Sequence, residues 1–346
     1  MSAADDILFE ARGALGLITL NRPKTLNALT LDMIHRMQAQ LDAWATDSKI
    51  GAVLITGAGG KAFCSGGDVR ALHEPGNEGL AEVFFRDEYR LNRTIYRYPK
   101  PYLALIDGIA MGGGVGVAVH ARYRIVTEAT VFAMPETAIG MFPDVGGSYF
   151  LPRMPGELGI YLALTGARMS GLDCLYANLA EVYIPSARRH AELVEALAGG
   201  ESPVRAIRRL HEHQGLAELA DQRQLIDHCF SGETVEEIIE RLSEQDGEWA
   251  AKTREAMLRM SPLAMKIALR ELRRGKQLTF ENCMTMEYRI SQRIAKAHDF
   301  REGVRAVLVD KDRKPRWNPA KLEDVTDEQV EAFFAPLDGN ELVFPG

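Results

Sequence analysis

Two acidic residues and two glycine loops are the parts of this chain that could do chemistry. Glu136 and Asp144 lie in the segment MPETAIGMFPDVGGSY, and the run Gly112–Gly114 comes about twenty residues earlier. A second glycine loop, Cys64–Asp68, also follows an apolar run typical of a strand. Free backbone N–H groups stabilise an oxygen that gains negative charge, and a carboxylate can move a proton or activate water. The pattern therefore predicts chemistry on a carbonyl group.

Each of these features also has a purely structural interpretation. Gly112–Gly114 could serve only close packing of a helix on a sheet, and the loop around Gly67 is on its own a turn. Glu136 follows Pro135, so it could be an acid in a first helical turn, stabilised by the helix N-terminus. Asp144 could be a turn residue or a helix N-cap. Two glycine loops after two strands nevertheless favour an oxyanion hole, which usually takes donors from separate segments.

Other reactive residues carry weaker signals. Glu88 falls on an expected helix and is predicted to be an acid on a solvated face. Cys64 stands beside a glycine loop but has no adjacent base, so a buried structural thiol competes with a nucleophile there. Ser148 is not in a GxSxG motif, and His35 and His120 lie near no nucleophile motif, which disfavours a serine hydrolase. Neither GxGxxG nor GxxxxGK[ST] occurs in the context that nucleotide binding requires.

The elements that must position these residues alternate between strand and helix. Two apolar runs on either side of Gly13 predict a β-hairpin, and Thr30 is the expected N-cap of an amphipathic helix. Strands are predicted next at Ala52–Thr56, Tyr102–Ile106, Arg124–Thr127 and Val131–Met134, with helices at 81–98 and from 115. This order favours an α/β fold with a mainly parallel sheet. We expect an α/β core over residues 1–190 and a mainly helical C-terminal region over 191–346.

Composition excludes several classes. The 346 residues are 46% hydrophobic and 26% charged, as in a globular protein, and 41 basic against 48 acidic residues give a net charge of −7. That balance argues against a general nucleic-acid-binding surface. The four cysteines are scattered, so we expect no disulfide framework and no metal site. The acidic N-terminus lacks secretory and transit signals, and no apolar run is long enough to span a membrane, so a cytoplasmic location is predicted.

The motifs together carry a family resemblance. The segments Leu20–Leu29, Lys61–Asp68, Lys100–Gly114 and Pro135–Glu136, in this order, resemble the enoyl-CoA hydratase/isomerase, or crotonase, superfamily. The resemblance spans about residues 7–190. It implies a spiral of ββα units. It also implies that the N–H groups of Gly67 and Gly113 bind a thioester oxygen.

One departure separates the chain from the hydratases of that superfamily, which carry a glutamate soon after the glycine run, where this chain has Val115-Gly116-Val117. Segments 84–89, 134–153, 286–289 and 298–306 instead resemble the branch that hydrolyses 3-hydroxyisobutyryl-CoA. That resemblance implies substrate-contacting or catalytic roles for Glu88, Gly113, Glu136 and Asp144. The implied activity is hydrolysis of a short-chain 3-hydroxyacyl-CoA thioester in valine breakdown, with Glu136 as base or nucleophile and Asp144 assisting.

The same resemblance implies an acyl-CoA substrate and no separate cofactor, because coenzyme A is part of the substrate. Arg22 and Lys24 are the candidates for binding its phosphates, although a solvated loop explains them equally well. An enoyl-CoA hydratase or isomerase, a non-catalytic module that binds CoA esters, and an RNA-binding relative are the competing interpretations. Oligomeric state stays open, since related proteins form trimers while the long C-terminal region could cover that surface.

Overall fold

The computed structural model describes residues 5–73, 79–185, 187–212 and 215–344. The chain forms two compact units that interleave along the sequence. Unit 1 comprises Met1–Asp68, Arg90–Phe132 and Met169–Asp221, and unit 2 comprises Val69–Tyr89, Ala133–Arg168 and Gln222–Gly346. The predicted boundary at residue 190 is a linear division, whereas each of these units is assembled from three separate stretches.

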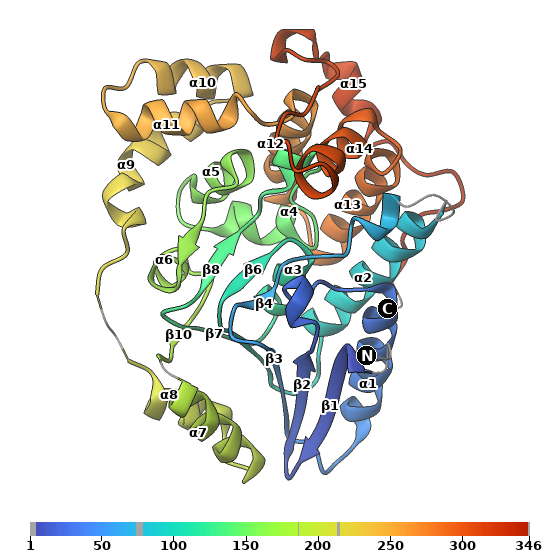
Figure 1. Cartoon of the computed structure of the whole chain (residues 1–346), viewed down its shortest axis with the longest axis vertical. Coiled ribbons are helices and arrows are strands. Elements are labelled where there is room, and N and C mark those ends of the chain that lie inside the picture. Colours follow the sequence, from blue (N-terminus) through green and yellow to red (C-terminus); the bar gives the residue numbers. More distant parts are fainter. Residues whose placement is uncertain (1–4, 74–78, 186, 213–214, 345–346) are drawn as a thin grey trace. The chain divides into compact units, whose positions relative to one another are not determined.

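Unit 1 is built on a six-stranded sheet whose order is β1-β2-β3-β5-β7-β10. β1 and β2 form an antiparallel hairpin, and the remaining neighbours are parallel (Figure 1). The bounds are β1 Ile7–Arg12, β2 Leu15–Leu20, β3 Ala52–Gly57, β5 Tyr102–Ile106, β7 Tyr123–Val126 and β10 Val182–Tyr183. The expected hairpin and the mainly parallel α/β sheet are confirmed.

A four-stranded sheet in the same unit runs in the order β4-β6-β8-β9. Its bounds are β4 Ala62–Cys64, β6 Ile109–Met111, β8 Val131–Ala133 and β9 Met169–Ser170. Successive pairs β3/β4, β5/β6 and β7/β8 each place their first strand in the large sheet and their second strand in the small one. An α-helix follows each of the strand pairs β1/β2, β3/β4 and β5/β6. This is the ββα repeat that the sequence resemblance implied.

The helices of unit 1 begin where the sequence favours a start. The Thr30 side chain accepts a hydrogen bond from the Met33 N–H at 3.2 Å and caps α1, as expected. The other bounds are α1 Leu31–Thr46, α3 Gly113–Val119, α6 Gly171–Tyr176, α7 Ala187–Ala198 and α8 Pro203–Leu210, while α2 Leu80–Tyr96 and α9 Leu219–Phe230 cross from one unit to the other.

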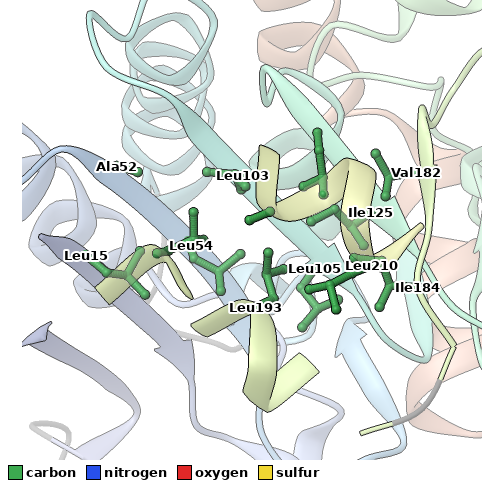
Figure 2. Packing of buried hydrophobic residues seen from close by; sticks show 13 residues of the cluster. Leu15, Ala52, Leu54, Leu103, Leu105, Ile125, Val182, Ile184, Leu193 and Leu210 are labelled. Carbon is green, nitrogen blue, oxygen red and sulfur yellow. The ribbon is translucent and has the colours of Figure 1, made fainter. Parts of the chain in front are cut away.

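One hydrophobic core lies between the large sheet and the hairpin of α7 and α8. Figure 2 shows Leu54, Leu105 and Ile125 of the sheet facing Leu193 and Leu210 of those helices. All five side chains are buried. Removing such side chains from water stabilises the unit by about 1.5–3 kcal/mol each. The core therefore fixes the strands whose connecting loops carry the glycines.

Unit 2 is mainly helical and contains the segment that carries Glu136 and Asp144. A 3₁₀ helix spans Glu136–Ile139, and α4 begins three residues after Asp144. The bounds are α4 Gly147–Phe150, α5 Leu158–Thr165, α10 Val235–Ser243, α11 Glu248–Met257, α12 Pro262–Gly275, α13 Phe280–Ile294, α14 His298–Val304 and α15 Asp327–Ala332. α12 and α13 both pack on α4. Among the helices of the described ranges, none has the length and apolar character that crossing a membrane requires.

Candidate active site

The two glycine loops of unit 1 lie next to each other because β4 and β6 are parallel neighbours. Cys64 pairs with Ala110, so the loops that leave these two strands start at the same end of the sheet. A Cβ atom built on Gly66 would lie 3.7 Å from the nitrogen of Gly113 and 3.3 Å from the oxygen of Met111. The φ of Gly66 is +119°, a conformation that favours glycine. The approach of the two loops therefore depends on this residue.

The N–H group of Gly67 is fixed in position but donates no hydrogen bond within the described part of the chain. The Leu29 N–H donates to the Gly66 oxygen at 2.8 Å, and the Asp68 N–H donates to the Leu29 oxygen at 2.8 Å. These bonds fix the peptides on both sides of Gly67. No group in the described part of the chain accepts a hydrogen bond from the Gly67 N–H. It is therefore available to an oxygen from outside the protein.

The three glycines of the 112–114 run differ in conformation and in surroundings. Gly112 has φ 50° and ψ −129° at the N-cap of α3, and Gly113 is the first helical residue. The first N–H groups of a helix have no acceptor within it, and the described residues offer none to Gly113. Gly114 serves packing, because a Cβ there would lie 2.3 Å from the Cys64 oxygen. The packing interpretation of the run therefore holds for Gly114, and oxyanion binding by Gly113 stays a prediction.

Arg22 supports the Gly67 loop. Its guanidinium group donates to Asp68 Oδ2 at 3.2 Å and to the Ala28 oxygen at 2.7 Å, and it forms an ion pair with Asp6 at 3.3 Å. These contacts hold the residue that follows Gly67. Lys24 is exposed. Binding of CoA phosphates by Arg22 and Lys24 stays a prediction.

Unit 2 gathers Glu88, Glu136 and Asp144 in buried positions. They are 1%, 5% and 4% exposed, so the expectation that Glu88 lies on a solvated helix face is wrong. Its helix, α2, is covered on this side. The next residue, Tyr89, donates its hydroxyl to Asp144 Oδ2 at 2.9 Å. α2 thereby places the Glu88 carboxyl group near Asp144 and the Tyr89 hydroxyl in hydrogen-bond contact with Asp144.

Glu136 is the first residue of the 3₁₀ helix Glu136–Ile139, and Pro135 is its N-cap. α14 supports this turn directly, since a Cβ on Gly303 would lie 2.3 Å from the Ile139 carbonyl carbon. Glu136 Oε2 is buried and has no hydrogen-bond partner among the described residues, and the same holds for Glu88 Oε1. A buried carboxyl oxygen without a partner is costly, and a substrate or water can satisfy it.

The electrostatics of these carboxyl groups favour proton uptake. Burial raises the pKa of Glu88 and of Glu136 well above the usual range, and the nearby Asp144 carboxylate raises both further. Burial also raises the pKa of Asp144, to about 7, although the hydrogen bond from Tyr89 opposes the rise. A pKa near neutral pH, as at Asp144, suits general acid–base catalysis, because the protonated and ionised forms of the carboxyl group are then close in free energy.

Three further acids of unit 2, Glu271, Glu287 and Asp299, are buried and were not singled out from the sequence as site residues. Glu287 on α13 accepts hydrogen bonds from the Gly146 N–H at 2.8 Å, the Ser148 N–H at 3.0 Å and the Ser148 hydroxyl at 2.5 Å. Glu271 on α12 is fully buried, and neither of its oxygens has a partner among the described residues. The segment 286–289 had marked Glu287 only through its resemblance, and Glu271 carries no local signal because its burial comes from packing.

Comparison with known proteins assigns the chain to a family. The model of the enoyl-CoA hydratase/isomerase family matches residues 15–334. The chain belongs to this family. The 3-hydroxyisobutyryl-CoA hydrolases of Danio rerio and Homo sapiens are 46% identical to it over 351 and 354 residues, covering 98% and 99% of this chain and 92% of each relative. Both are named as mitochondrial proteins, so the predicted cytoplasmic location gains no support from them.

Two solved structures share the fold over almost the full length. A carnitinyl-CoA dehydratase from Mycobacterium thermoresistibile is 43% identical with a TM-score of 0.94, and the match covers 99% of both chains. An enoyl-CoA hydratase from Rhodobacter sphaeroides 2.4.1 is 40% identical with a TM-score of 0.92, covering 98% of this chain and all of that one. The predicted crotonase-like α/β fold is confirmed.

The four cysteines are buried, as structural thiols are. Cys64 is fully buried, and its thiol contacts the Gly66 oxygen at 3.7 Å, in keeping with a structural thiol. Cys174, Cys229 and Cys283 are buried and free as well. Within the described ranges, no group of three or more His, Cys, Asp or Glu side chains is arranged to hold a metal ion.

Proposed function

We propose that the chain is an acyl-CoA thioester hydrolase whose substrate is 3-hydroxyisobutyryl-CoA or a closely similar short 3-hydroxyacyl-CoA. Full-length identity of 46% to hydrolases named for this substrate supports the activity. The structural observation that carries the mechanism is the buried Glu136 oxygen without a partner. In unit 1, the N–H groups of Gly67 and Gly113 have no acceptor among the described residues, and the family resemblance implies that they bind the thioester oxygen.

In the proposed reaction, the thioester oxygen accepts hydrogen bonds from the Gly67 and Gly113 N–H groups. Ionised Glu136 removes a proton from water, whose oxygen attacks the carbonyl carbon, and the negative charge moves to the carbonyl oxygen. When the C=O bond reforms, the C–S bond breaks, and the CoA thiolate takes up a proton. Asp144 assists by orienting the substrate hydroxyl or by moving this proton, and Glu88 contacts the substrate.

A variant of this mechanism has Glu136 attack the thioester directly and form an anhydride, which water then cleaves. A single turnover in ¹⁸O-labelled water tests for the anhydride. Label that enters the Glu136 carboxyl group shows that an anhydride formed and that water attacked its Glu136 carbonyl carbon, which excludes the simple base role. Label found only in the released acid excludes that attack, and leaves either a general base or an anhydride cleaved at the acyl carbon.

Hydration of an enoyl-CoA is the second candidate, because the two solved structures described above are named as a dehydratase and a hydratase. Against it, residues 115–117 contain no acid where hydratases of the superfamily carry one. Release of free thiol from 3-hydroxyisobutyryl-CoA, measured beside loss of absorbance from a 2-enoyl-CoA, separates the two. We expect thiol release; rapid hydration of the enoyl-CoA without thiol release would overturn the proposal.

The cofactor requirement, the pathway, the compartment and the oligomeric state are also proposals. The substrate brings its own coenzyme A, so no separate cofactor, metal, nucleic acid or membrane is required, and a homo-oligomer stays open. The 3-hydroxy acid product fits valine degradation. The relatives described above are named as mitochondrial proteins. Cell fractionation tests the compartment, and sedimentation tests the oligomeric state.

A further inference from the structure

The backbone that follows Asp144 is held in an unfavourable conformation. Val145 has φ 51° and Gly146 has φ 90°. A left-handed conformation is rare for a β-branched residue, so the surrounding structure must impose it on Val145. Two residues with positive φ reverse the chain immediately after Asp144. The direction of the Asp144 carboxyl group therefore depends on whatever maintains this turn.

Glu287 is the residue that fastens the turn. It is fully buried, and its carboxyl oxygens accept hydrogen bonds from two main-chain N–H groups and one hydroxyl of the segment Gly146–Ser148. N–H groups of one tight turn that converge on an anion in this way form an anion-binding nest. Here a side chain 141 residues away in the sequence fills the nest. α12 supports the other side, since a Cβ on Gly275 would lie 2.0 Å from the Ser148 oxygen.

We propose that Glu287 is a positioning residue for the hydrolytic step: its carboxyl group holds the strained Val145–Ser148 backbone and thereby aims Asp144. The inference rests on the proposed function, because it assigns Glu287 an effect on catalysis through Asp144. Glu287 itself makes no contact with the reacting atoms in this account. The Tyr89 hydroxyl fixes the far end of Asp144 at 2.9 Å, so the carboxyl group is held at its backbone and at its tip.

A double-mutant cycle tests this role. Glu287→Gln keeps the shape of the side chain, but its amide N–H₂ group would face a hydrogen-bond donor, either at Gly146 or at Ser148. Because misplacement of a reacting group by about 1 Å costs about 100-fold in rate, we expect kcat to fall about 100-fold with KM within about threefold. In the Asp144→Asn background the same change should cost less than about threefold, since residues that act as a unit are non-additive.

Glu271→Gln is the matched control, because Glu271 is an equally buried acid of the same unit without a hydrogen-bond partner. It should keep at least about half of the wild-type kcat, as expected for a residue outside the reaction. Equal losses from Glu287→Gln in both backgrounds would show a merely structural role and overturn the inference, as would an unchanged kcat. If Glu287→Gln does not fold, Ser148→Ala replaces it in the cycle, with an expected loss of about tenfold in the wild-type background only.

Hydrogen exchange separates failure of this inference from failure of the proposed function. If the wild type releases no thiol from any 3-hydroxyacyl-CoA, the proposed function fails. The turn can still be measured by mass spectrometry on a peptide that spans residues 141–150. Exchange at least about tenfold faster in Glu287→Gln than in wild type and in Glu271→Gln supports the fastening role. Equal exchange in all three proteins contradicts it.

Discussion

At the scale of single residues, burial changes the chemistry of acids that look ordinary in the sequence. The motif resemblance identified Glu136 and Asp144 by position, and the structure adds that both are buried and that Glu136 has an unsatisfied oxygen. Glu88 could not be assigned correctly from its helix alone, because the periodicity of α2 does not reveal what covers that face. Which acids are buried is decided by tertiary packing.

The Tyr89 hydroxyl should set the pH at which Asp144 ionises. Its hydrogen bond lowers a pKa that burial has raised to about 7. Tyr89→Phe removes this opposing effect, so the pKa of Asp144 should rise and the acidic limb of the kcat/KM profile should move to higher pH by about one unit. Stopped assays from pH 5 to 9 measure the shift. Tyr98→Phe is the control, since the Tyr98 hydroxyl donates to the Leu41 oxygen; an equal shift there would refute the assignment.

Whereas Tyr89→Phe should raise the pKa of Asp144, Asp144→Asn should lower the pKa of Glu136. The negative charge of Asp144 raises the pKa of Glu136, so its removal should lower that pKa. The acidic limb of kcat/KM should then move to lower pH, although kcat itself falls about 10- to 1000-fold with the loss of the assisting group. An acidic limb that stays in place or moves upward in this variant would contradict the proposed coupling of the two carboxyl groups.

At the scale of elements, the glycine loops show what spacing can predict. The strands β3 and β5 follow from apolar runs, whereas the short strands β4 and β6 were not predicted, and it is their parallel pairing that brings the two loops together. Spacing alone could not separate the individual glycines, because their surroundings depend on contacts across the sheet, and only the family resemblance pointed to Gly67 and Gly113. Gly114 packs on Cys64, Gly66 permits the approach of the loops, and Gly113 carries the free N–H group.

Gly66→Ala should damage the oxyanion donors. The new Cβ would lie 3.3 Å from the Met111 oxygen, and φ +119° disfavours alanine, so the Gly67 peptide must shift. Because loss of one oxyanion donor costs about 100- to 1000-fold in kcat, we expect a loss of at least about tenfold. Gly60→Ala is the matched control: it has φ +67° and nothing within 4 Å of its Cβ. Stopped thiol assays give kcat for both. Equal, small losses would argue against a role for the Gly67 N–H.

At the scale of the whole molecule, the sequence predicts the α/β fold and a helix-rich C-terminal half but not the interleaving of the two units. Hydrophobic periodicity reports only on neighbouring residues, whereas each unit combines segments that are far apart in the sequence. Unit 2, for example, combines Val69–Tyr89 with Gln222–Gly346. The buried acids of unit 2 come from α2, the 136–144 segment, α12 and α13, and only the tertiary fold collects them. They should make stability depend on pH.

Glu271→Gln tests this dependence. Burial, and then the charge of Glu287, raises the pKa of Glu271 well above its usual range, so the folded state holds a proton that the unfolded state releases above about pH 4. Its contribution to stability is therefore full below the unfolded pKa and is lost as pH rises through the folded pKa. Calorimetry should show that the variant is more stable than wild type by at least about 1 kcal/mol at pH 8, and by much less at pH 4. A constant difference would contradict this.

The most direct test of the account is the initial rate of thiol release from 3-hydroxyisobutyryl-CoA by wild type and by Glu136→Gln, with binding of the same ester measured by calorimetry. We predict that the wild type releases CoA, and that the variant loses about 100- to 10,000-fold in kcat while it still binds the ester. A Glu136→Gln protein that hydrolyses the thioester at nearly the wild-type rate would contradict the central role of this carboxyl group.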